Sequence, residues 1–105
     1  MSAFEQVWQY LQANLSKNQK VENWGVRGYS GNQFAVVECE RNAIVVKSLR
    51  TQNERCVTKS EFEKVYPYYQ KLRSGQIGRA ELGEATQSRN TSYILSLLNW
   101  YQSNR

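Results

Sequence analysis

Two short apolar runs in the middle of the chain constrain the fold more than any other feature. Residues 34–37 (Phe-Ala-Val-Val) and 43–46 (Ala-Ile-Val-Val) are each apolar at four consecutive positions, with the polar pair Arg41-Asn42 between them. Short runs of this composition, separated by turn residues, predict neighbouring antiparallel strands. Successive strand side chains point to opposite faces, so we expect both faces of the sheet centre to be covered, by helices or by a second copy of the chain.

Strand-like patterns continue on both sides of these runs. The turn residues Ser30-Gly31-Asn32 and Thr51-Gln52-Asn53 interrupt them. The expected strands are 23–29, 33–40, 43–49 and 55–59. Adjacent runs joined by tight turns predict an antiparallel meander.

The ends of the chain have helical spacing instead. Ser2 and Glu5 form a capping box, and apolar residues then recur every three or four positions, which predicts a helix over 3–16. A second capping box, Ser60 with Glu63, precedes a helix that contains Pro67 and stops at Ser74-Gly75. A short segment over 79–85 and a final helix from about Asn90 follow.

These elements predict one domain, residues 1–105, of the α+β class. A three- or four-stranded antiparallel meander would be packed by an N-terminal helix and a C-terminal group of two or three helices. The final helix has no charged residue from Asn90 to Asn104, so we expect it to be buried or to form an interface.

Two residue types that carry much of enzyme chemistry are missing. The chain has no histidine, and its nine acidic residues are all glutamates. Histidine is the usual general acid or base near neutral pH and a common metal ligand. We therefore expect a binding protein without a cofactor, not an enzyme.

The charge points to a polyanionic partner. The net charge is +5, and residues 41–105 hold eleven lysines and arginines against five glutamates. Such asymmetry favours nucleic acid or an anionic membrane surface, although charge that only keeps the protein soluble would look the same. We expect the partner to be nucleic acid, with double-stranded DNA favoured, and not a membrane.

One candidate reader of DNA is the segment from Arg79 to Leu95. Its layout resembles a helix-turn-helix, with arginines at 79 and 89 and the polar residues Asn90, Thr91 and Ser92 at the start of the second helix, where base edges can be reached. The segment lacks a glycine in the turn. The alternative is two packed helices with Asn90 or Ser88 as an ordinary N-cap.

A second candidate is a basic hairpin region. Its members are Arg41, Lys47, Arg50, Arg55 and Lys59, and they surround the polar turn 51–53. Side chains of this kind neutralise phosphates. Charges on edge strands also serve to block aggregation, which is the alternative here.

Aromatic residues suggest two further roles. Trp24 and Tyr29 flank Arg27. Aromatic rings beside an arginine can stack on the bases of single-stranded nucleic acid. The alternative is that these rings pack in or around the core, as most aromatic residues do. In the uncharged final helix, Tyr93, Leu97 and Tyr101 could instead bind a protein partner or a second copy of the chain.

A third hypothesis is a metal-dependent nuclease. Residues 34–40 (Phe-Ala-Val-Val-Glu-Cys-Glu) resemble the apolar strand ending in Glu-x-Lys of restriction-enzyme-type nuclease cores, but Glu40 stands where the lysine belongs. Glu22, Glu38 and Glu40 would have to hold the magnesium ion.

The remaining patterns predict a cytoplasmic location. The first residues have no basic leader, no run is long enough to span a membrane, and Cys39 and Cys56 are expected to be reduced thiols.

Overall fold

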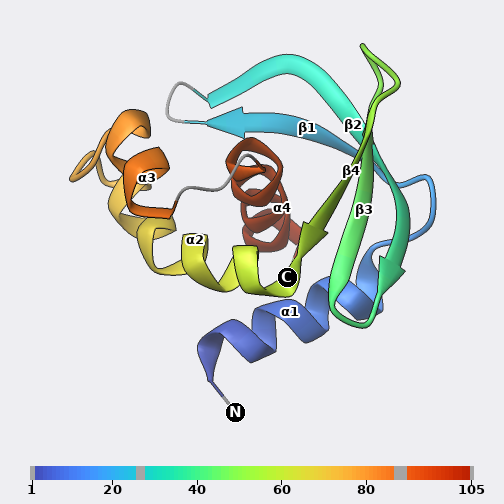
Figure 1. The fold of residues 1–105 in the computed structure, drawn as a ribbon, viewed down its shortest axis with the longest axis horizontal. Helices are drawn as coiled ribbons and strands as arrows, with labels where there is room; N and C mark the ends of the chain where they lie inside the picture. The colour runs from blue at the N-terminus through green and yellow to red at the C-terminus, as the bar shows by residue number, and fades with distance from the viewer. Residues whose placement is uncertain (1, 26–27, 87–89, 105) are drawn as a thin grey trace.

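The computed structural model describes residues 2–25, 28–86 and 90–104. Its elements are α1 (Ala3–Asn14), β1 (Lys20–Gly25), β2 (Gly28–Glu40), β3 (Ala43–Ser48), β4 (Glu54–Thr58), α2 (Lys59–Arg73), α3 (Arg79–Thr86) and α4 (Thr91–Asn104). The strands form one antiparallel sheet in the order β1-β2-β3-β4. The sheet curves around α4, while α1 and α2 lie along its open side (Figure 1). The predicted α+β class and antiparallel meander are confirmed.

The first two strands differ from the prediction in their limits. β1 begins at Lys20, because Val21 is buried and pairs with Phe34 of β2. Ser30, Gly31 and Asn32 were expected to form a turn but belong to β2. Gly31 has φ +89°, a conformation that glycine adopts without strain, so here it marks an irregularity within a strand and not a chain reversal.

The helices pack on the concave side of the sheet (Figure 1). Ile44, Val46 and Val57 point to that side and are fully buried. The expectation that helices cover both faces is wrong. Of the outward positions, Ala35 and Ala43 are 9% and 7% exposed, whereas Val45 is half-buried and Cys56 is exposed. A second copy of the chain on the outer face stays a prediction.

The start of α2 is shifted by two residues from its predicted cap. Thr58, which is extended, accepts a hydrogen bond from the Glu61 backbone N–H, and the Glu61 carboxylate accepts one from the Thr58 backbone N–H. The capping box is therefore Thr58 with Glu61, because β4 runs directly into the helix and Ser60 already lies in the first turn. The predicted stop is confirmed, with Ser74 as C-cap and Gly75 at φ +79°.

α4 is the central helix of the molecule. Ile94, Leu95, Leu97 and Leu98 are at most 1% exposed. Of the two explanations for its missing charge, burial is correct, because the sheet wraps around this helix and α1 and α2 pack against it (Figure 1).

The residues of α4 predicted to bind a partner make contacts inside the chain. Leu97 has no exposed surface. The ring of Tyr93 packs edge-on against Phe34 at 5.0 Å between centroids, and the ring of Tyr101 packs against Tyr10 at 5.1 Å. This helix therefore offers little free apolar surface to a second chain.

Candidate functional site

The β3–β4 hairpin carries three of the predicted basic residues at its free end. Lys47 pairs with Glu54 and Val46 with Arg55, so Lys47 and Arg55 flank the turn that contains Arg50. Hydrogen bonds between the main-chain atoms of Ser48 and those of Gln52 and Asn53 close this turn. The hairpin extends beyond the rest of the sheet at the upper right of Figure 1. We call Lys47, Arg50 and Arg55 the basic tip.

Arg41 and Lys59 lie at the other end of the same strands. Arg41 is in the turn between β2 and β3, and the Lys59 backbone N–H donates to the Asn42 carbonyl at 2.7 Å. The Lys59 ammonium forms an ion pair with Glu5 at 2.9 Å. The five residues predicted as one basic region therefore separate into two groups at opposite ends of the hairpin.

The predicted reading segment is placed only in part. Arg79 is the first residue of α3, and Arg89 falls outside the described residues. Asn90 and Thr91 are 7% and 1% exposed, whereas Ser92 is exposed. A base-reading role for this helix start stays a prediction, and Ser92 is its exposed member.

Asn90 instead joins three elements. Its side-chain N–H group donates to the Glu61 carboxylate at 2.9 Å and to the Cys56 carbonyl at 3.4 Å. These bonds attach the start of α4 to β4 and to the first turn of α2, which is a structural use of a buried amide.

The three glutamates of the nuclease hypothesis do not come together. Glu22 pairs with Gln33 on β2, five residues before Glu38, which corresponds to about 15 Å along a strand. Within 2–25, 28–86 and 90–104, no three carboxylates or thiols are grouped closely enough to hold a metal ion. The predicted magnesium site is absent from this part of the chain.

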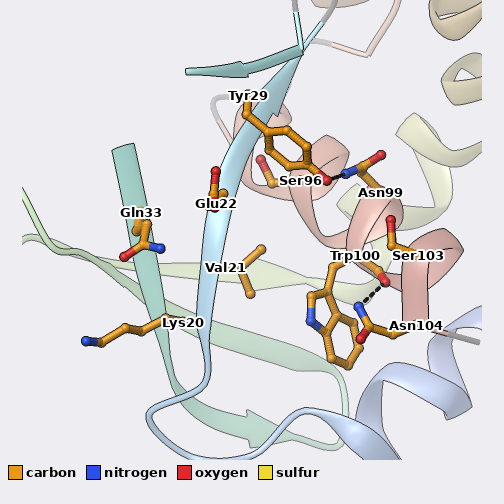
Figure 2. A pocket seen from close by; sticks show the side chains of 10 residues that line it. All are labelled: Lys20, Val21, Glu22, Tyr29, Gln33, Ser96, Asn99, Trp100, Ser103 and Asn104. Atoms are coloured by element: carbon orange, nitrogen blue, oxygen red, sulfur yellow. Dashed lines mark hydrogen bonds between the residues drawn. The ribbon is translucent and has the colours of Figure 1, made fainter. Parts of the chain in front are cut away.

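A pocket of about 210 Å³ lies between β1 and the second half of α4 (Figure 2). Two aromatic rings, Tyr29 and Trp100, stand at opposite ends of it, and polar side chains occupy the sides. The lining residues are Lys20, Val21, Glu22, Tyr29, Gln33, Ser96, Asn99, Trp100, Ser103 and Asn104.

Tyr29 is held in place although its ring is free. Its side chain is 58% exposed, and its hydroxyl oxygen accepts a hydrogen bond from the Asn99 amide at 2.9 Å. The sequence pattern singled out Tyr29 as a candidate stacking residue but did not point to the α4 residues that line the same pocket. Ser96, Asn99 and Ser103 recur at helical spacing, and this polar stripe on an otherwise apolar helix was the available signal.

Two groups near the sheet, the buried Tyr69 and the half-buried Cys39, have shifted pKa values. Burial raises the pKa of Tyr69, whose ring contacts Trp24 at 5.7 Å and has the Arg73 guanidinium over it at 5.9 Å. Burial, and secondarily the carboxylate of Glu38, raises the pKa of the Cys39 thiol. Both groups are therefore neutral near pH 7.

Comparisons of the chain with protein-family models, curated proteins and solved structures gave no match. None of the helices in the described residues is both long and apolar enough to cross a bilayer. Function must therefore be argued from the arrangement of the side chains themselves.

Proposed function

We propose that this protein binds nucleic acid through contacts between the phosphate backbone and the basic tip of the β3–β4 hairpin. The observation that carries the proposal is that Lys47, Arg50 and Arg55 lie around the turn at a projecting end of the sheet, with Lys47 on the outer face of the hairpin and Arg55 on the opposite face. Lysines and arginines placed in this way neutralise phosphates and release condensed counterions.

The charges of the basic tip are available for such contacts. Glu54 faces Lys47 across the two strands, but the only ion pair within 4.0 Å among the described residues is Lys59 with Glu5. Arg50 and Arg55 are both exposed. The tip therefore retains a positive excess that a polyanion can use.

A further cation extends the basic tip across the outer face of the sheet. Cross-strand pairing places Lys20, Ala35 and Lys47 in one row. The two lysines are two strand spacings apart, about 10 Å, with only the short alanine side chain between them. Nucleic-acid backbone that contacts the tip can thus continue toward β1.

Our sequence prediction favours double-stranded DNA, with the start of α4 reading bases. Asn90 and Thr91 are buried, so base reading by the start of α4 has less support than phosphate contacts made by the basic tip. The partner is accordingly proposed as nucleic acid, and the strand type is left to the experiment.

A salt titration tests the proposal. The affinity for labelled duplex DNA, single-stranded DNA and RNA is measured by fluorescence anisotropy between about 50 and 200 mM salt, and we expect it to fall steeply. Replacing Lys47, Arg50 and Arg55 together by glutamine should make the slope of log affinity against log salt for duplex DNA less steep by about 2 to 3.

A matched variant separates the basic tip from net charge. Lys17, Lys64 and Lys71 are also exposed, and replacing them by glutamine removes the same charge from other parts of the chain. We expect this variant to keep most of the wild-type slope. Equal losses in the two variants would contradict a role for the tip, and no binding at the lowest salt would contradict nucleic-acid binding itself.

A further inference from the structure

We infer that the pocket between β1 and α4 takes an unpaired nucleobase of the bound nucleic acid. This inference rests on the proposed function. It adds a second contact site for nucleic acid, separate from the basic tip. The basic tip would hold the backbone, while the pocket would receive one base from a single-stranded stretch.

The size of the pocket favours one ring system. Pockets for drug-sized ligands occupy roughly 300–1,000 Å³, and this pocket has about 210 Å³. Its volume suits a single flat group and not a longer ligand.

The aromatic residues of the pocket suit stacking. Tyr29 exposes 58% of its surface, and its hydrogen bond from Asn99 fixes the ring in one orientation before any ligand arrives. Trp100 lies at the other end of the pocket, with Tyr10 next to its indole at 6.2 Å between centroids (Figure 2). Exposed aromatic rings in a basic protein are the usual platform for unpaired bases.

The polar lining suits the edge of a base. The amides of Asn99 and Asn104 offer donors and acceptors on the α4 side of the pocket, and Glu22 offers an acceptor on the β1 side, whereas Gln33 lies on the far side of β1 (Figure 2). Apart from Lys20 and Glu22, the lining has no charged side chain, which suits a ligand group that carries no net charge.

The pocket and the basic tip are connected through β2. The Leu49 backbone N–H, one residue before Arg50, donates to the carbonyl of Gln33 at 3.1 Å, and Gln33 lines the pocket. Lys20 also lines the pocket, and its side chain extends away from α4 toward the outer face (Figure 2). A single strand of nucleic acid that continues from the basic tip would therefore reach the pocket at the β1 edge of the sheet.

The test compares a labelled single-stranded oligonucleotide with an abasic strand of equal length and charge, by anisotropy at low salt. We expect the strand with bases to bind roughly 5- to 100-fold more tightly, the range that stacking of one base provides. Tyr29→Ala should abolish this preference without weakening the binding of the abasic strand. Tyr29→Phe keeps the ring and should keep most of the preference.

The other outcomes have distinct meanings. Salt-sensitive binding with equal affinity for the two strands would overturn the base pocket and leave the proposed function intact. No binding of either strand or of the duplex would overturn both. Neutral monosaccharides should leave the fluorescence of Trp100, identified with the Trp100→Phe variant, unchanged. Quenching by a monosaccharide, without quenching by the oligonucleotide, would assign the pocket to sugars and overturn the inference.

Discussion

Individual buried polar residues hold the elements of this protein together. Asn90 is the clearest case, because its amide donates both to the Glu61 carboxylate and to the Cys56 carbonyl. Ser96 is another, since its hydroxyl oxygen accepts a hydrogen bond from the Trp24 backbone N–H at 2.8 Å and its hydroxyl donates to the Ser92 carbonyl. Such residues connect segments that lie far apart in the sequence.

Replacing Asn90 by alanine should therefore affect stability. Loss of the amide leaves two acceptors in a partly buried place without this donor, and we expect the free energy of unfolding to fall by about 1–3 kcal/mol. Urea denaturation measures it. Asn32→Ala, the same change at an exposed position, should alter stability by no more than about 0.5 kcal/mol. A stable Asn90→Ala variant that has lost nucleic-acid affinity would instead show Asn90 to be a reader.

At the scale of elements, α4 determines how the other parts are arranged. Its apolar residues fill the space inside the curved sheet, and its polar stripe of Ser96, Asn99 and Ser103 faces the pocket beside β1. One helix thus supplies both the core and one wall of the candidate ligand pocket.

A charge in the apolar part of α4 should unfold the protein. Leu97 has no exposed surface, and even Leu97→Ala should lower the free energy of unfolding by about 2–5 kcal/mol. Leu97→Lys should be worse, because it also buries a charge without a partner. Ser103→Lys, on the exposed part of the same helix, is the matched control and should fold normally. The expected unfolding would be contradicted if Leu97→Lys stayed folded and had half the mass of the wild-type protein in light scattering. That result would support a dimer interface.

At the scale of the whole molecule, the sheet determines which residues share a face. Cross-strand pairing groups Cys39 with the buried residues Ile44 and Val57, whereas Cys56 pairs with Val45 on the outer face. The two thiols are free, and Cys56 is the exposed one. The topology therefore separates two cysteines that the sequence alone would allow to pair.

Oxidation should not join Cys39 to Cys56. They lie on strands separated by β3, so their Cα atoms are about 10 Å apart, beyond the roughly 7 Å limit for a disulfide. Cys56 should also alkylate faster at neutral pH, because burial shields Cys39 and raises its pKa, which lowers its thiolate fraction. Mass spectrometry after treatment with iodoacetamide measures both rates. An intramolecular disulfide, or faster labelling of Cys39, would contradict the arrangement of the strands.

The sequence by itself determined the class and order of the elements. The apolar runs 34–37 and 43–46 and the helical spacing around them depend on local periodicity, which a short stretch of chain contains in full. The same local information placed Gly75 at a helix end.

Only the tertiary structure decided which functional groups meet. The separation of Arg41 and Lys59 from the basic tip, the burial of Asn90, and the pocket between Tyr29 and Trp100 all depend on contacts between residues distant in sequence. Periodicity contains no information about which elements pack together, because that is decided by burial of the whole apolar surface at once. In this protein the sheet curves around α4, and this packing brings those distant residues together or keeps them apart.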